Sequence, residues 1–376
     1  MPVTDVRRAH PLPEPRVTEE SPRVWCLLGH RAGDNNQVLA LAEALGWGFE
    51  EKRVAYNALR LVPNRLVSRG AFALRADARD RLRPPWPDLV IGIGQRSVPV
   101  ARWIQAQSGG QTRAVHIGWP RCDPAGLDLV VTTANYPVAP CPNVLTLPAC
   151  MSRATAGRLR DEADRWRFLL ERFPPPWFLL VLGGNSWPWR LSPRVAVETA
   201  EMLAARSVGR GGSVLAVSSR RTPPAVADAV HAALQRSQSP AALFRPDDSQ
   251  GNAYLGLLAL SDQVAVTGDS VAMLSDAISA DKTLAVVPVE CGHVSRAMLA
   301  TLRACLPDPA LGPDAQPIRT WLARRGITDW SRDVGRFWAT ARRQGLLGSL
   351  ADPVRPELTP PARIAADWVK ARLQCG

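Results

Sequence analysis

Four short loops contain residues that could bind an anion or move a proton. They are Gly29–Gln37 (GHRAGDNNQ), Gly94–Ser97 (GQRS), Gly183–Ser192 (GGNSWPWRLS) and Thr267–Ser270 (TGDS). Each follows a short apolar run, as a loop does when it leaves a buried strand. In an open parallel α/β sheet, ligands bind where such loops converge at the carboxyl ends of the strands. We therefore expect the binding site of this protein to be built from these loops.

The TGDS loop has the composition of a phosphate-binding turn. A helix is predicted over Val271–Ser279, and its first N–H groups and its dipole favour a bound anion. Gly268 would let a bulky anion approach the backbone closely. Asp276, inside that helix, would accept hydrogen bonds from sugar hydroxyls. The alternative interpretation is structural: an acid or serine of the loop merely caps the helix, and Asp276 is solvated.

The Gly183–Asn185 turn permits the same close approach on a neighbouring strand, although an ordinary βα turn has the same composition. The two loops together would hold a diphosphate, with Arg190 and either Arg220 or Arg221 as counter-charges. His293 follows the last strong strand and would touch a bound phosphate or the cleft.

The first loop contains His30 and Asp34, which would serve as a general base for a hydroxyl acceptor. The alternative is that Asp34 caps the helix predicted over Asn35–Leu45. His116 lies within a strand-like run and is predicted to be a core or rim residue.

Two domains are predicted from the order of the elements. Apolar runs alternate with helix-length segments, which indicates parallel sheets covered by helices on both faces. The Pro-rich segment Phe173–Trp177 cannot lie inside a helix or central strand, so we place a hinge at Arg172–Pro176. The expected parts are a disordered tail (1–22), two Rossmann-like βαβ domains (23–172 and 173–300) and a helical tail (301–376) that packs back on the body. The expected strands lie in the runs Val24–Gly29, Asp88–Gly94, Arg113–Gly118, Asp128–Thr133, Asn143–Pro148, Trp177–Asn185, Ser213–Ser219, Ala242–Pro246, Gln263–Gly268 and Thr283–Val289.

Composition indicates a globular protein with anionic partners. The chain has 376 residues, 46% of them hydrophobic and 21% charged, and no apolar run long enough to span a bilayer. The net charge of +12 favours anionic partners. Nucleic acid is the least favoured of these, because the sequence has no compact Lys/Arg run interleaved with aromatic residues. Seven cysteines without a CxxC pair indicate reduced thiols and a cytoplasmic location. The segment Trp321–Arg343 fits peripheral contact with an acidic membrane, or an amphipathic helix that packs on the body.

The ordered set of motifs resembles the mitochondrial-fission ELM-type family of GT-B glycosyltransferases, which has many bacterial members. The motifs are GHRAGDNNQ, PDLVIGIGQRS, WPR followed by DLVVTT, NVLTLP, LLVLGGN and VTGDSVAMLSDA, between about Val24 and about Leu299. The resemblance implies an α/β, GT-B-like fold in which two Rossmann-like domains face a cleft. A nucleotide-sugar donor would be held mainly by the C-terminal domain. The sequence departs from the family at Thr132–Tyr136 (TTANY), which lacks the His and acid that many relatives carry there.

The expected site residues follow from the loops and from this resemblance. Those expected to bind the donor are Gly183, Gly184, Asn185, Thr267, Gly268, Asp269, Ser270, Asp276 and His293. Those expected at the acceptor or in the cleft, beside the catalytic His30 and Asp34, are Gly33, Gln37, Gln95 and Arg96. Asp276 stands where relatives often have the longer Glu, which would contact the ribose.

Other enzyme classes match less well. Gly92–Ser97 lacks the last glycine of a dinucleotide-binding fingerprint, and a P-loop motif is absent. The sequence has no Asp-x-Asp pair to bind a metal, so we expect transfer without a metal or cofactor. The expected acceptor is a hydroxyl of an envelope glycan or a lipid-linked molecule, at the inner face of the membrane. Two alternatives stay open: a serine hydrolase with Ser270 as nucleophile, weakened by Ala272 in place of the second glycine, and a non-catalytic adaptor.

Overall fold

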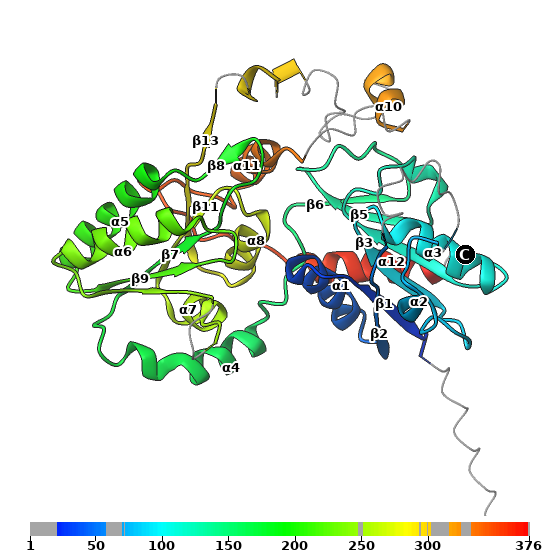
Figure 1. Ribbon diagram of the computed structural model, residues 1–376, viewed down its shortest axis with the longest axis horizontal. Helices are drawn as coiled ribbons and strands as arrows, with labels where there is room; N and C mark the ends of the chain where they lie inside the picture. Colours follow the sequence, from blue (N-terminus) through cyan, green and yellow to red (C-terminus); the bar gives the residue numbers. More distant parts are fainter. Residues whose placement is uncertain are drawn as a thin grey trace, which may run out of the picture.

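The computed structural model describes residues 21–57, 70, 72–246, 251–292, 295–298, 300–301, 316–324 and 332–374. Within these ranges the chain forms two α/β domains that lie side by side (Figure 1). His293 and the expected disordered tail up to residue 20 lie outside the described residues.

The N-terminal domain is built on a six-stranded sheet of order β2-β1-β3-β4-β5-β6, in which every neighbouring pair is parallel. Its strands are β1 (Val24–Leu28), β2 (Phe49–Arg53), β3 (Leu89–Ile93), β4 (Arg113–Ile117), β5 (Leu129–Thr133) and β6 (Val144–Leu147). Its helices are α1 (Ala32–Leu45), α2 (Ala76–Arg79), α3 (Ser97–Gln107) and the 3-10 turn η2 (Pro124–Gly126). The apolar strands are buried because helices cover both faces, as expected for a parallel sheet. β2 was not predicted: its sequence, FEEKR, is charged because the strand lies at the sheet edge.

The C-terminal domain has a five-stranded parallel sheet of order β10-β9-β7-β11-β12. Its strands are β7 (Trp177–Leu182), β9 (Ser213–Ser218), β10 (Ala241–Phe244), β11 (Gln263–Thr267) and β12 (Thr283–Val287). The helices are α5 (Pro193–Val208), α6 (Pro224–Arg236), α7 (Tyr254–Leu260) and α8 (Val271–Ser279). A short antiparallel pair, β8 (Trp189–Arg190) with β13 (Glu290–Cys291), follows the sheet at its carboxyl edge.

The boundary between the two cores lies earlier than the hinge predicted at Arg172–Pro176. Helix α4 (Ala156–Trp166) and the 3-10 turn η3 (Arg167–Leu170) precede that hinge, yet Leu159, Trp166 and Leu170 are buried in the same core as the strands of the C-terminal sheet. The chain therefore passes between the domains after β6 and before α4. The prolines mark only the entry into β7.

The C-terminal tail packs back on both domains. Helix α11 (Val334–Arg343) buries Val334, Phe337 and Ala341 in the C-terminal core. Helix α12 (Pro361–Gln374) returns to the N-terminal domain and packs beside α1, where Ala365 and Val369 are fully buried (Figure 1). Along the chain, helix α10 (Pro317–Arg324) comes after the C-terminal domain and before α11. No described helix is both long and apolar enough to cross a membrane.

Candidate functional site

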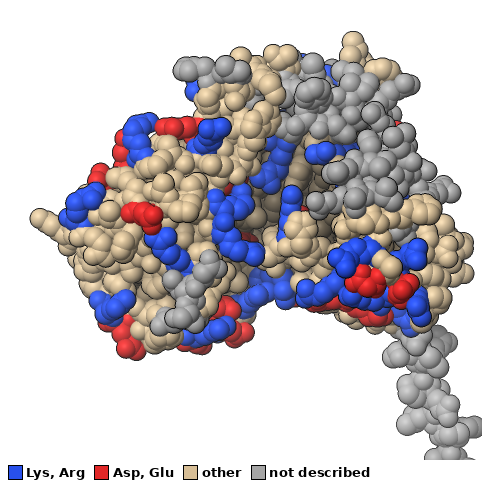
Figure 2. All heavy atoms as spheres, in the orientation of Figure 1, with Lys and Arg blue, Asp and Glu red and all other residues tan. Residues whose placement is uncertain are grey.

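The carboxyl edges of the two sheets meet at a hollow between the domains. Figure 2 shows this hollow, with lysine and arginine side chains along its walls. The two domains touch at its floor, where the backbone N–H of Cys150 donates to Ser275 Oγ at 2.9 Å and Ser152 Oγ donates to Asp276 Oδ1 at 2.5 Å. These contacts bring the loop after β6 against helix α8.

Asp269 is a buried anion inside the expected donor loops. Its side chain is fully buried, and it accepts hydrogen bonds from Gly184 N at 2.8 Å and from Thr267 Oγ1 at 2.7 Å. Arg221, whose side chain is 48% exposed, places Nη2 3.4 Å from the same carboxylate. Burial raises the pKa of Asp269, and these donors oppose the shift.

The Gly183–Asn185 turn is therefore shaped around a protein group. A Cβ on Gly183 would lie 2.5 Å from Asp269 Oδ1, and Gly183 N donates to Thr267 Oγ1 at 2.7 Å. Asn185 is exposed, and its Oδ1 accepts from Leu191 N at 3.1 Å, which closes the turn before α5. The expectation that the Gly183 and Gly184 amides hold a diphosphate is wrong in this structure, because both amides donate to side chains of the protein.

Gly268 serves a packing contact. Its N–H donates to Val287 O at 3.0 Å, and its carbonyl accepts from Trp338 Nε1 at 2.9 Å. A Cβ at this position would lie 2.6 Å from Trp338 Cζ2. Trp338 also packs on Trp189, with ring centroids 4.7 Å apart. The close approach that we expected for an anion is thus made by helix α11.

The start of helix α8 keeps its anion-binding potential. Ser270 occupies the N-cap position and is buried, but its side chain makes no capping hydrogen bond. The capping alternative is therefore wrong for Ser270, and also for Asp269, whose carboxylate points to Gly184 and Thr267. The first N–H groups of an uncapped helix are free to bind an anion. The guanidinium of Arg221 is held next to this helix start by Asp269.

Asp276 lies at the domain junction, half-buried and hydrogen-bonded to protein, and so differs from the freely solvated side chain of the structural alternative. It accepts hydrogen bonds from Ser152 Oγ and, at 3.2 Å, from the Tyr254 hydroxyl of α7. Burial raises its pKa to about 6, although both hydrogen bonds and the charge of Arg158 act in the opposite direction. A ribose would have to share this carboxylate with the two protein hydroxyls.

The first loop places Asp34 and His30 at the same hollow. Helix α1 begins at Ala32, so Asp34 lies in its first turn, half-buried, while His30 is exposed. Burial raises the pKa of Asp34, and the charges of Arg31, Arg332 and His30 oppose the shift. Both members of the predicted pair therefore lie close enough to interact.

Asn35, which was not predicted, closes this loop. Asn35 Oδ1 accepts from Gly29 N at 2.9 Å, and its Nδ2 donates to Gly29 O at 3.0 Å. No side chain caps α1 at Arg31, so the alternative in which Asp34 caps the helix is wrong. The carboxylate of Asp34 remains available to a ligand.

Tyr136 and Arg332 complete the site and were not recognised in the sequence. Arg332 Nη2 donates to Ser186 Oγ at 3.0 Å in the C-terminal domain. Its charge also lowers the pKa of Tyr136, which burial raises, and that of Asp34 in the N-terminal domain. The TTANY segment contains Tyr136, but Arg332 lies in the tail, where no motif indicated a site.

The remaining expected residues lie in the N-terminal domain. Gly33 faces open space, and Gln37 lines a small pocket beside β4, β5 and β6. Gln95 and Arg96 are half-buried at the turn between β3 and α3, where Gly94 has a φ of +75°.

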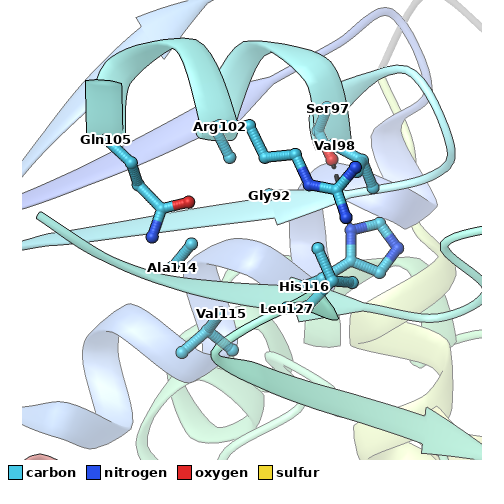
Figure 3. A pocket seen from close by; sticks show the side chains of 10 residues that line it. Gly92, Ser97, Val98, Arg102, Gln105, Ala114, Val115, His116 and Leu127 are labelled. Atoms are coloured by element: carbon cyan, nitrogen blue, oxygen red, sulfur yellow. Dashed lines mark hydrogen bonds between the residues drawn. The ribbon is translucent and has the colours of Figure 1, made fainter. Parts of the chain in front are cut away.

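His116 is a core residue, as one of the two predictions for it had stated. It lies under α3 in a separate small pocket, with its Nδ1 3.5 Å from Ser97 Oγ (Figure 3). Burial lowers its pKa to about 4, so the ring is neutral near pH 7. This pocket does not belong to the hollow between the domains.

The structure gives no support to the hydrolase alternative. In the described ranges the Ser270 hydroxyl has no hydrogen bond to a histidine. The predicted partner, His293, lies outside them. Within the same ranges no group of three or more His, Cys, Asp or Glu side chains could hold a metal ion.

Comparison with known proteins identifies the family. Residues 32–305 match the family described as "Mitochondrial fission ELM1". The chain belongs to this family. It is 25% identical to the mitochondrial fission protein ELM1 of Arabidopsis thaliana over 235 residues, which cover 56% of this chain and 53% of that protein. It is 20% identical to "Uncharacterized protein RP120" of Rickettsia prowazekii, over 69% of this chain and 82% of that protein. The match to the plant ELM1 protein thus spans about half of its length.

The solved structures that match this ELM1-family chain share little sequence with it. The UDP-GlcNAc 2-epimerase of Methanocaldococcus jannaschii has a TM-score of 0.46 and 10% identity, with 94% of this chain and 100% of that chain covered. MurG of Acinetobacter baumannii has a TM-score of 0.44 and 12% identity, covering 93% and 100%. The glycosyltransferase SnogD of Streptomyces nogalater has a TM-score of 0.43 and 15% identity, covering 94% and 99%. The two parallel-sheet domains and the helical tail of a GT-B-like fold are seen directly in the structure, and Figure 2 shows the hollow between the domains.

Proposed function

We propose that this ELM1-family protein transfers a sugar from a nucleotide-diphosphate donor to a hydroxyl acceptor bound between its domains. The observation that carries the proposal is the uncapped start of α8 beside Arg221, at the carboxyl edge of the C-terminal sheet. Helix N–H groups and an arginine together would neutralise the diphosphate as it leaves. No step in this scheme calls for a metal ion.

The donor site differs in detail from the one expected from sequence. The phosphates would lie at the amides of Val271, Ala272 and Met273, because those of Gly183, Gly184 and Gly268 already donate to protein oxygens. Asp269 would position Arg221 rather than touch the donor. Asp276 would accept the ribose hydroxyls, and it can do so only if Ser152 or Tyr254 shares the carboxylate.

Asp34 is the better placed of the two predicted bases. It is half-buried at the hollow, whereas His30 is exposed at the surface. The proton of the acceptor hydroxyl would pass to the Asp34 carboxylate as the acceptor oxygen bonds to the anomeric carbon. The bond from that carbon to the diphosphate oxygen would break, and the nucleoside diphosphate would leave.

The acceptor would be an envelope-glycan or lipid-linked hydroxyl, reached from the cytoplasmic face of the membrane. Exposed Ile318 and Trp321 lie three residues apart on α10, and such a pair can enter the headgroup region of a bilayer. The net charge of +12 would favour acidic lipid. Co-sedimentation with phosphatidylglycerol vesicles tests this contact: Trp321→Ala should weaken it, and equal binding of both proteins would contradict it.

A non-catalytic adaptor is the second candidate. It is favoured by the way the protein fills its own donor loops, with Asp269 and Thr267 on the glycine amides and Trp338 on Gly268. An adaptor of this kind would bind no nucleotide diphosphate. The two candidates therefore differ in a property that is simple to measure.

Calorimetry with UDP, GDP and ADP separates the candidates, with the matching monophosphates as controls. Transferase function predicts that one diphosphate binds more tightly than its monophosphate. Release of that diphosphate from the corresponding sugar nucleotide should then slow in Asp34→Asn and stay unchanged in Asp161→Asn, an exposed acid on α4. Absence of binding to all three diphosphates would contradict the proposal and favour the adaptor.

A further inference from the structure

A small pocket opens at the carboxyl ends of β4, β5 and β6, beside helix α1. Its polar lining consists of Gln37, Thr132, Thr133 and Tyr136, and the rest of the wall is Gly118, Cys150 and the apolar side chains of Ile117, Val131, Leu147 and Met151. The pocket has about 190 Å³ of empty space, counting the part open to solvent, and its closed end has room for one water-sized group. Neither the catalytic nor the donor residues predicted from sequence line it.

We propose that this pocket is the subsite that receives one hydroxyl or hydroxymethyl group of a sugar acceptor. As a binding site it stands on its own geometry, and its role in transfer rests on the proposed function. The chemistry that it would recognise is a neutral polyol, because its polar groups are hydroxyl, phenol and amide, its remaining side chains are mostly apolar, and no Asp, Glu, Lys or Arg is among the described residues that line it.

Thr132 provides the strongest evidence for a ligand. Its side chain is only 4% exposed, and Thr132 Oγ1 has no hydrogen-bond partner among the described residues. The neighbouring hydroxyl, Thr133 Oγ1, donates to Asn135 Oδ1 at 2.6 Å and is satisfied. A buried polar atom without a partner costs about 1–3 kcal/mol, so its retention in a pocket points to a partner that is bound during function.

Gln37 supplies a second polar group at this pocket. It is half-buried on α1, and in the described part of the chain its side-chain amide makes no hydrogen bond to protein. An amide offers both donors and an acceptor, as a sugar hydroxyl requires. Gln37 and Thr132 belong to different elements, the first turns of α1 and the end of β5, so they approach the pocket from two sides.

The mouth of the pocket lies beside the proposed base. Asp34 stands three residues before the lining residue Gln37 on α1, so the two side chains project from the same side of that helix. The charge of Asp34 also raises the pKa of Tyr136, which lies in the pocket wall. Arg332 contacts the same tyrosine and reaches Ser186 in the donor domain at 3.0 Å. A sugar anchored by one hydroxyl at Thr132 would therefore present a neighbouring hydroxyl to Asp34, on the side that faces the donor.

Titration with methyl hexopyranosides tests the pocket in the full chain, by saturation-transfer NMR with methyl glucoside, galactoside and mannoside as probes. We expect at least one to bind and to lose about tenfold in affinity in Thr132→Val, which removes only the hydroxyl. Gln37→Leu should give a similar loss. The matched control is Thr146→Val: Thr146 pairs with Thr132 across β5 and β6 but is exposed.

Melting temperature provides a second readout. Because Thr132 Oγ1 has no protein partner, Thr132→Val should leave the melting temperature unchanged or raise it. No glycoside binding to the wild type, or equal affinity in Thr132→Val and Thr146→Val, would overturn the subsite. UDP, GDP and ADP binding is measured in the same samples. If a diphosphate binds but no glycoside does, only the proposed acceptor subsite is overturned. If a glycoside binds in a way that depends on Thr132 but no diphosphate binds, only the proposed donor site is overturned.

Discussion

The carboxylate of Asp269 accepts a hydrogen bond from the backbone N–H of Gly184 at 2.8 Å, across 85 positions of the chain. This contact joins the loops after β7 and β11, two adjacent strands of the sheet. It also means that the Gly184 N–H already has a partner within the protein. The glycine turn is filled by a protein carboxylate, and the exposed positive group that the carboxylate holds is Arg221.

Removal of this carboxylate should destabilise the C-terminal domain. Asp269→Ala leaves Gly184 N–H and the Thr267 hydroxyl without their acceptor, at a cost of about 2–5 kcal/mol in the free energy of unfolding. Asp269→Asn keeps an acceptor and should cost less. Urea unfolding measures both variants against Asp228→Ala, which removes an exposed ion pair and should cost below about 1 kcal/mol. Equal stability of Asp269→Ala and Asp228→Ala would show that Asp269 has no structural role.

The close packing of Trp338 on residue 268 should require a glycine at that position. A Cβ there would approach Trp338 Cζ2 to 2.6 Å, so Gly268→Ala should cost about 1–3 kcal/mol of stability. In a Trp338→Leu background the same change should cost almost nothing, because the indole that it would meet is absent. A double-mutant cycle measures this coupling. Additive effects would contradict the packing role and return Gly268 to the list of ligand-contact residues.

Asp276 should make stability depend on pH. Burial raises its folded-state pKa to about 6, above the unfolded value of 3.8, so the folded protein binds the proton more tightly. The stabilising contribution of Asp276 to the free energy of unfolding is therefore fully present below about pH 4 and is lost as pH rises through about 6. The loss is on the order of 2–3 kcal/mol. Unfolding free energies of the wild type and of Asp276→Asn, measured from pH 4 to 7.5, should converge at the lower end and diverge at the upper end, with the variant more stable. A constant difference across this range would contradict the raised pKa.

The sequence predicts the sheets well because their strands are buried on both faces. The runs that contain β1, β3, β4, β5, β7, β11 and β12 are largely apolar, and the helix predicted over 271–279 has the bounds of α8. The domain boundary was misplaced because the partners of Leu159 and Trp166 are set by tertiary packing, which the prolines at 174–176 do not reveal. Local composition marks a turn, but it does not tell which core a preceding helix joins.

The site could be predicted only in part, for a similar reason. The loops after the strands were located correctly, since in a parallel sheet they must gather at one edge. Whether an Asp in such a loop faces a ligand or a neighbouring turn depends on Gly183 and Gly184, which lie in the turn after another strand. Arg332 reaches Ser186 from 146 positions away, and the local sequence carries no signal for that contact.

The central claim is that a nucleoside diphosphate binds at the start of α8 with Arg221 as its counter-charge. Calorimetric titration of Arg221→Ala and Arg220→Ala, with the diphosphate that binds the wild type most tightly, tests this claim most directly. Both side chains are exposed and adjacent, but Asp269 holds only Arg221 at the helix start. We predict that Arg221→Ala weakens binding by about tenfold or more, and that Arg220→Ala changes it by less than about twofold. Affinities within twofold of the wild type in both variants would contradict the account.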